Sequence, residues 1–101
     1  MVEQLKINVF YMGGIHSATG KEMEILEVED DITVRRLLFL LVRQYGERFK
    51  EAVMDLKSTM ERPWLKVIVS VNGKALNALD GLDTVLRNGD SMAFMTMVSG
   101  G

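Results

Sequence analysis

The residues best suited to chemistry stand at the end of the sequence, where Gly100 is followed by Gly101. Glycine makes up about 7% of ordinary proteins, so a terminal pair arises by chance in about one chain in two hundred. Because glycine has no Cβ, a di-glycine segment can pass through a narrow channel that excludes other residues. Such a segment can bring a terminal carboxylate against the α-phosphate of a nucleotide. For the pair alone, a flexible end without function is the alternative interpretation.

The other reactive side chains do not form the pattern of a catalytic or metal site. The chain has no cysteine, so it has no thiolate chemistry of its own. His16 is the only histidine, and adjacency alone does not make it a catalytic pair with Ser17. The glycines at 13, 14 and 20 are not followed by the Lys-Ser/Thr of a phosphate-binding loop. We therefore expect no metal site and no bound cofactor, and a chain that is not itself an enzyme.

Two groups of charged residues have a possible binding role, an acidic group that could bind a cation and a basic group that could contact a partner. Solvated surface is the simpler interpretation of both. The acidic group surrounds the end of a predicted strand and comprises Glu27, Glu29, Asp30 and Asp31. The basic group lies on a predicted helix and comprises Arg35, Arg36 and Arg43.

Composition excludes several classes of function. Hydrophobic residues make up 48% and charged residues 26%, which is typical of a globular domain. The net charge is −2 and the pI is about 5.3, so no basic stripe is present to follow a nucleic acid backbone. The longest apolar run, at 37–42, is far shorter than the ~20 residues of a membrane span. The first ten residues do not resemble a signal peptide. We expect a cytoplasmic protein without nucleic acid or membrane partners.

The elements that position the tail begin with a predicted hairpin. Residues 4–12 alternate apolar and polar side chains, which is typical of a half-buried strand. The segment IHSAT at 15–19 lies between glycines and is predicted to be a polar loop. Residues 21–28 form the second predicted strand, in which the alternation slips near Ile25-Leu26 and indicates a bulge.

Two helices are predicted next. Thr33 can cap a helix whose apolar residues recur at helical spacing up to Tyr45, and Gly46 is suited to end it. A second amphipathic stretch covers about 47–58 and ends before Pro63. We interpret this second helix as an accessory element that lies outside the chemistry of the tail.

Three further strands complete the predicted fold. Residues 65–71 alternate, Asn72-Gly73 is a strong hairpin signal, and a short return strand reaches Leu76. A helical turn and a loop at 82–90 lead to a last strand at 92–97. This order predicts an α+β fold, a mixed sheet with helices packed on one face. The predicted core contains Leu5, Ile7, Val9, Leu37, Leu41, Val67 and Val69.

Several segments together resemble the MoaD/ThiS family. They are the opening hairpin, DDITVRRLL at 30–38, VSVNGKAL at 69–76 and LDTVLRNGDSMAFMTMVSGG at 82–101. The resemblance implies a β-grasp (ubiquitin-like) domain over 1–101 with a flexible tail at 98–101. Family tails often carry proline before the Val-x-Gly-Gly end, whereas Thr96 and Met97 stand there in this chain. Since proline stiffens an extended segment, this tail is expected to be looser.

The resemblance also implies a function for the tail. The Gly101 carboxylate would be adenylated by a ubiquitin-activating-like enzyme that uses ATP, and then converted to a thiocarboxylate. The sulfur would pass to a pterin precursor, with this chain as the small subunit beside the molybdopterin synthase large subunit. The alternative is a ubiquitin-like modifier that is joined through Gly101 to lysines of substrate proteins. A third possibility is an interaction module without tail chemistry.

The tail needs a docking surface in addition to its own contacts. Ordering residues 98–101 costs about 1–2 kcal/mol per residue, which their few side chains cannot easily repay. The residues predicted to contact partners are Phe94, Met95, Met97 and Val98. Strand alternation allows one outward set in the last strand, either Met92 with Phe94 or Met95 with Met97. We favour the second set, because methionine is common on adaptable binding surfaces.

Overall fold

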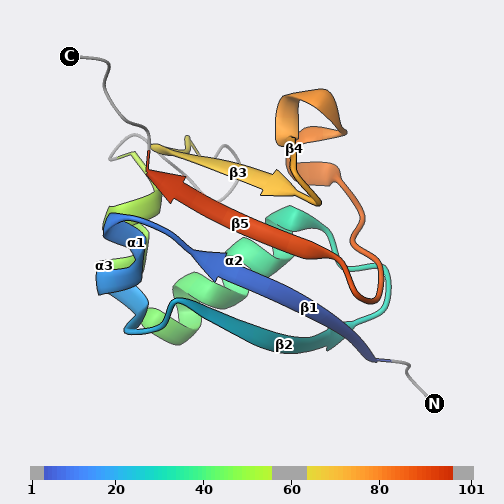
Figure 1. Cartoon of the computed structure of the whole chain (residues 1–101), viewed down its shortest axis with the longest axis horizontal. Helices are drawn as coiled ribbons and strands as arrows, with labels where there is room; N and C mark the ends of the chain where they lie inside the picture. The colour runs from blue at the N-terminus through green and yellow to red at the C-terminus, as the bar shows by residue number, and fades with distance from the viewer. Residues whose placement is uncertain (1–3, 56–63, 97–101) are drawn as a thin grey trace.

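Within the described residues, 4–55 and 64–96 of a computed structural model, five strands form one sheet. They are β1 (Gln4–Tyr11), β2 (Met23–Glu29), β3 (Val67–Val71), β4 (Lys74–Ala75) and β5 (Ser91–Thr96). Their order is β2-β1-β5-β3-β4 (Figure 1). β1 and β5 run parallel at the centre, and the other neighbouring strands are antiparallel. The first and last strands of the fold are therefore direct neighbours.

The hairpin of β1 and β2 is regular. Its register is continuous along the whole of β2. The bulge predicted near Ile25-Leu26 is wrong, because these residues stand opposite Asn8 and Ile7 without an extra residue between them. Ile25 is 59% exposed. The irregular apolar pattern thus reflects an isoleucine on the outer face of the sheet and no slip in register.

The segment predicted to be a polar loop forms helix α1 (Gly14–Thr19). Ile15 has no exposed surface and anchors this helix in the core. Gly20 ends it in the left-handed conformation, and its N–H donates to the carbonyl of His16. A six-residue helix with one apolar anchor shows no helical periodicity in the sequence, so the prediction failed here.

Helix α2 (Val34–Tyr45) begins and ends as predicted. The hydroxyl of Thr33 accepts a hydrogen bond from the N–H of Arg36, which caps the first turn. Gly46, at φ 79°, ends the helix, and its N–H donates to the carbonyl of Val42. The apolar stripe of α2 faces the sheet and is buried; it contains Val34, Leu37, Leu38 and Leu41.

The second predicted helix is shorter than expected. Helix α3 (Glu47–Val53) ends where Met54 becomes extended and pairs with Leu65. The prediction of a helix to residue 58 is wrong for Met54 and Asp55, and residues 56–58 lie outside the described part of the chain. Phe49 has no exposed surface and packs edge-on against Tyr11 and Phe94 in the core. The helix is thus an integral part of the core, while its independence from the tail chemistry stays a prediction.

The second half of the chain contains the predicted tight turn. Asn72 and Gly73 have φ values of 52° and 83°, which few other residues adopt easily. The amide of Asn72 also bonds both the N–H of Ser91 and the carboxylate of Asp90, so the turn is tied to the start of β5. The return strand β4 ends at Ala75, and two 3-10 turns follow, η1 (Leu76–Ala78) and η2 (Gly81–Asp83).

The helices cover one face of the sheet, as Figure 1 shows with the helices behind the strands. This confirms the predicted α+β fold. One cluster of buried side chains joins the two layers. All seven residues predicted for the core are buried, from 0% exposed at Ile7, Val9, Leu37 and Leu41 to 8% at Leu5. Among the described helices, none combines the length and apolar character required to cross a membrane.

Candidate functional site

The predicted reactive end follows directly on a central strand. Gly100 and Gly101, together with the predicted contact residues Met97 and Val98, lie outside the described residues. The last described residue is Thr96, at the end of β5. β5 is bonded on one side to β1 and on the other to β3. At its end, Met95 and Thr96 pair with β3 alone.

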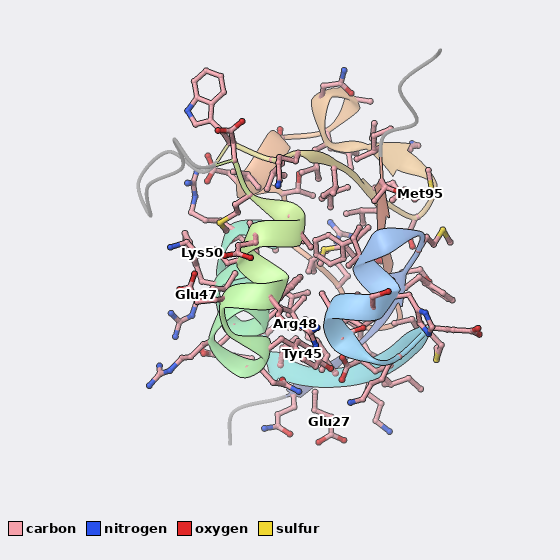
Figure 2. The ribbon with its side chains drawn as sticks, turned by 90° about the vertical axis from the view of Figure 1, so that its left-hand side faces the viewer. Glu27, Tyr45, Glu47, Arg48, Lys50 and Met95 are labelled. Carbon is pink, nitrogen blue, oxygen red and sulfur yellow. The ribbon has the colours of Figure 1, made fainter. Side chains whose placement is uncertain are left out.

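Adjacent residues of β5 have opposite environments. Phe94 has no exposed surface, and its ring stacks on Tyr11 at a centroid distance of 6.0 Å. The prediction of Phe94 as a partner contact is corrected here, because its side chain belongs to the core. Met92 is equally buried, whereas Met95 is 38% exposed. Met95 lies on the opposite side of the molecule from Glu47 and Lys50 of α3 (Figure 2). The favoured outward set is thus correct for Met95.

Met95 belongs to a larger apolar surface that sequence reasoning did not identify. Ile68 pairs with Met95 across β3 and β5, and Phe10 pairs with Met23 across β1 and β2. The exposed or half-exposed apolar residues on the uncovered side of the sheet form what we call the open-face patch: Phe10, Met12, Met23, Ile25, Ile68, Ala93 and Met95. Phe10, Ile68, Ala93 and Met95 each alternate with buried residues of their own strand. The alternation was visible in the sequence, but the cross-strand pairs were not.

Met95 and Ile68 of the open-face patch lie near the end of β5, whereas Ile25 pairs with Asn8 beside the start of that strand. Toward the other end of β1 the uncovered face is polar, with Lys6 and Asn8 on the strand itself. There, the amide of Asn88 accepts from the backbone N–H of Lys6. An open groove of about 450 Å³ borders the patch and is lined in part by Met12, His16 and Glu22. A partner bound near the end of β5 would contact both the open-face patch and Thr96, the last described residue before the tail.

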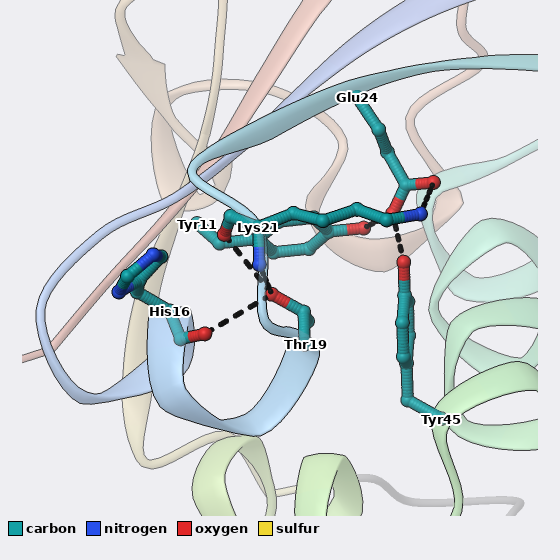
Figure 3. Close-up of polar contacts among 6 residues, drawn as sticks. All are labelled: Tyr11, His16, Thr19, Lys21, Glu24 and Tyr45. Carbon is teal, nitrogen blue, oxygen red and sulfur yellow. Dashed lines mark hydrogen bonds and ion pairs between the residues drawn. The ribbon is translucent and has the colours of Figure 1, made fainter.

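A second cluster of side chains is polar and half-buried, and it connects β1, β2 and α2 (Figure 3). The Tyr11 hydroxyl donates to Glu24 Oε2 at 2.6 Å, and the Tyr45 hydroxyl donates to the same oxygen. Lys21 Nζ contacts Glu24 Oε1 at 3.4 Å and lies over the ring of Tyr45. Burial raises the pKa of the Tyr11 hydroxyl far above its usual value, and the hydrogen bond to Glu24 raises it further.

The same contacts keep Glu24 charged. Its partial burial acts to raise the pKa, but the hydrogen bonds from Tyr11 and Tyr45 outweigh burial and hold the pKa below its usual value. A glutamate with a lowered pKa and both oxygens engaged is poorly suited to act as a general acid or base at neutral pH. The cluster therefore fastens the hairpin to α2. No sequence pattern indicates this cluster, because its members lie on three separate elements.

The remaining candidates are surface residues. His16 is exposed on α1, in agreement with its interpretation as an ordinary surface histidine. The acidic residues at 27 and 29–31 are all exposed as well. Within the described segments 4–55 and 64–96, no three His, Cys, Asp or Glu residues gather as they would to hold a metal ion.

A mixed sheet in the order β2-β1-β5-β3-β4, crossed on one face by α2, defines a ubiquitin-like β-grasp protein. The sequence model of the ThiS family matches residues 9–101. The chain belongs to the ThiS family, whose members are small ubiquitin-like carriers and modifiers and in general not enzymes.

Solved structures share this fold over almost the whole chain. A Pyrococcus furiosus protein, described as a candidate molybdopterin converting factor subunit 1, has a TM-score of 0.73 at 24% identity, covering 93% of this chain and 99% of its own. Small archaeal modifier protein 1 from Methanosarcina acetivorans has a TM-score of 0.76 at 23% identity, covering 98% and 99%. The Amycolatopsis orientalis BexX/CysO complex has a TM-score of 0.68 at 18% identity, covering 94% and 99%. No curated protein sequence matches the chain.

Proposed function

We propose that this chain is a sulfur carrier that acts through the carboxylate of Gly101 and donates sulfur in molybdopterin synthesis, as the small subunit of the synthase. The observation that carries the proposal is the family match, which extends through Gly100 and Gly101. The resemblance in fold to a candidate molybdopterin converting factor subunit supports the choice of pathway. A cytoplasmic location fits the same role.

The chemistry assigned to the tail has two steps. In the first, a carboxylate oxygen of Gly101 attacks the α-phosphorus of ATP, and pyrophosphate leaves to give an acyl-adenylate. In the second, a sulfide sulfur attacks the carbonyl carbon, and AMP leaves to give a thiocarboxylate. The nucleotide site and the catalytic groups belong to an adenylating partner, and this chain supplies the carboxylate and the surface that docks.

The open-face patch is the surface proposed to dock. It contains several large apolar side chains, with Ile25 at 59% and Ile68 at 40% exposed, and Ile68 pairs with Met95 next to the end of β5. Clustered exposed apolar residues of this kind often mark protein interaction sites. We assign it to contacts with the adenylating enzyme and with the synthase large subunit. One similar structure, the BexX/CysO complex, holds a β-grasp protein together with a partner.

Shortening or lengthening the tail tests the proposal. Deletion of Gly101 shortens an extended chain by about 3.5 Å, and addition of one alanine moves the carboxylate away by the same distance. A misplacement of only about 1 Å can lower a rate about a hundredfold. With the adenylating enzyme of the source organism, both variants should fold and still compete with the wild-type chain for docking, yet fail to support ATP–pyrophosphate exchange. If the deletion variant supports exchange at the wild-type rate, the chain does not act through Gly101.

Protein modification is the second candidate function, and the similarity to a small archaeal modifier protein favours it. Both functions begin with adenylation of Gly101 and differ in the group that accepts the activated carbonyl. In a modifier the acceptor is a lysine amine, and the product is an isopeptide bond. Peptide mass spectrometry of proteins copurified with a tagged chain distinguishes the two. Lysines linked to Gly101 would establish the modifier, whereas a carrier leaves the tail unconjugated.

A further inference from the structure

The turn between β1 and α1 lies against the base of the tail. Gly13 has φ 65° and ψ −137°, a backbone conformation that is essentially restricted to glycine. A Cβ placed on Gly13 would lie 2.2 Å from Thr96 Oγ1 and 3.4 Å from Thr96 Cβ. The main chain of this turn thus approaches the last described residue of β5 more closely than any side chain would allow.

The turn is held from both sides, so it cannot easily move away. Tyr11 before it is 2% exposed, and Ile15 after it has no exposed surface. Between them, the N–H of Met12 donates to the carbonyl of Phe94 at 2.9 Å. Two buried anchors and a backbone hydrogen bond therefore fix Gly13 relative to the sheet.

The opposite flank of the strand end is also fixed. Thr96 pairs with Val67 and Met95 pairs with Ile68 in the antiparallel ladder of β3 and β5. Thr96 consequently lies between β3 on one side and the Gly13 turn on the other. A side chain added at Gly13 would collide with the Thr96 hydroxyl, so the Thr96 side chain or the strand end that carries it must shift.

Gly13 differs in this respect from the other described glycines with positive φ. A Cβ on any of the others, Gly20, Gly46, Gly73, Gly81 or Gly89, would meet nothing within 4 Å. Gly46 is the best comparison, because its φ of 79° and ψ of −156° fall in the same glycine region. At those positions, glycine is required only by the backbone conformation. At Gly13, glycine is required both by the backbone conformation and by the close approach to Thr96.

We propose that Gly13 is a positioning residue for the Gly101 carboxylate. Through its close approach to Thr96, Gly13 sets the position and direction in which the tail leaves the fold. This inference rests on the proposed function. Five residues follow Thr96, and an extended chain advances about 3.5 Å per residue, so the carboxylate reaches at most about 17 Å from Thr96. When a partner holds both the open-face patch and the end of the tail, the position of Thr96 sets where the connecting segment starts. Displacement of Thr96 then misplaces the carboxylate while docking is retained.

The test compares Gly13→Ala with Gly46→Ala in ATP–pyrophosphate exchange, with the source organism's adenylating enzyme and varied concentrations of the full-length chain. Both substitutions impose similar backbone strain, but only the first adds an atom against Thr96. Gly13→Ala should lower kcat at least tenfold with KM within twofold, since the patch is unchanged. Gly46→Ala should leave both parameters within twofold. Circular dichroism at the assay temperature confirms that each variant is folded.

A rescue variant separates positioning from general damage. Thr96→Ala removes Oγ1 and Cγ2, so the nearest remaining atom to the new methyl group of Gly13→Ala is Thr96 Cβ at 3.4 Å. The double variant should therefore have a kcat within threefold of Thr96→Ala alone. The comparison of the double variant with Thr96→Ala still tests the proposal if Gly13→Ala by itself does not fold. A kcat of the double variant more than tenfold below that of Thr96→Ala contradicts the proposal.

The outcomes distinguish this inference from the function on which it rests. If the wild-type chain supports no exchange, the proposed function fails. If the wild-type chain is active and Gly13→Ala has the same kcat as Gly46→Ala, Gly13 does not position the tail. A fall in kcat at Gly13→Ala that Thr96→Ala reverses supports the inference.

Discussion

The two faces of the sheet are built from the same strands but have different roles. In β5, Phe94 is fully buried while the next residue, Met95, is 38% exposed. In β3, Val69 is 4% exposed and its neighbour Ile68 is 40% exposed. The side chains on the helix-covered face thus stabilise the fold, and those on the uncovered face form an apolar surface that a partner can contact. Because strand alternation separates them residue by residue, neighbouring substitutions should change different properties.

The largest effect is expected on the covered face. Phe94→Ala removes a ring that contacts Tyr11 and Phe49, and it should lower the free energy of unfolding by about 3–5 kcal/mol. Met95→Ala, one residue away, should lower it by less than about 1 kcal/mol. Urea denaturation followed by circular dichroism measures both. Equal losses at the two positions would show that the faces are not divided as described.

Substitutions on the uncovered face should weaken binding of the adenylating enzyme. Met95→Gln and Ile68→Gln each place a polar group in the open-face patch, and together they should raise the KM for the adenylating enzyme at least tenfold, equivalent to about 1.4 kcal/mol. The free energy of unfolding should change little, since both side chains are exposed. Lys6→Ala, on the polar end of the same face, is the matched control and should leave KM unchanged. An unaltered KM in the double variant would remove the patch from the docking surface.

The smallest effect concerns the polar cluster that fastens β2 to α2. Folding lowers the pKa of Glu24 below the unfolded value of about 4.3, so its contribution to stability is complete above that pH and is lost as pH falls through the lower folded pKa. Glu24→Gln should cost about 1 kcal/mol at pH 7 and flatten the loss of stability below about pH 4.5. Urea titrations between about pH 2.5 and pH 7 measure this loss of stability, because the lower limit lies about 2 units below the unfolded pKa.

Glu27→Gln is the control for this pH dependence, because Glu27 lies exposed on the same strand. It should retain the acid-induced loss seen in the wild-type protein. If Glu24→Gln and the wild-type protein lose stability in parallel as pH falls, the hydrogen bonds from Tyr11 and Tyr45 do not stabilise the charged carboxylate.

The sequence predicted features that are encoded locally. Thr33 and Gly46 mark the ends of α2, Asn72-Gly73 marks the hairpin, and alternation places Ile7 and Val9 in the core. Each depends on the conformational preference of a few adjacent residues. The order of elements then limited the fold to a mixed sheet covered on one face.

The missed features depend on residues far apart in the chain. Helix α1 is stabilised by one buried side chain, Ile15, whose burial depends on the completed core. The polar cluster brings Glu24 to Tyr11 and Tyr45, which are 13 and 21 residues away. Assignment of Phe94 to a partner surface failed because the sequence allows two parities for β5, and the pairing with β1 and β3 selects one.

The most direct test of the central claim is the mass of the chain itself. Intact-protein mass spectrometry is carried out after incubation with ATP, sulfide and the adenylating enzyme of the source organism. The wild-type chain should gain the mass difference between sulfur and oxygen, localised to Gly101 by fragmentation, while the chain lacking Gly101 should gain nothing. An unchanged mass in the wild-type chain, under conditions in which the same enzyme modifies another carrier, would show that Gly101 does not carry sulfur.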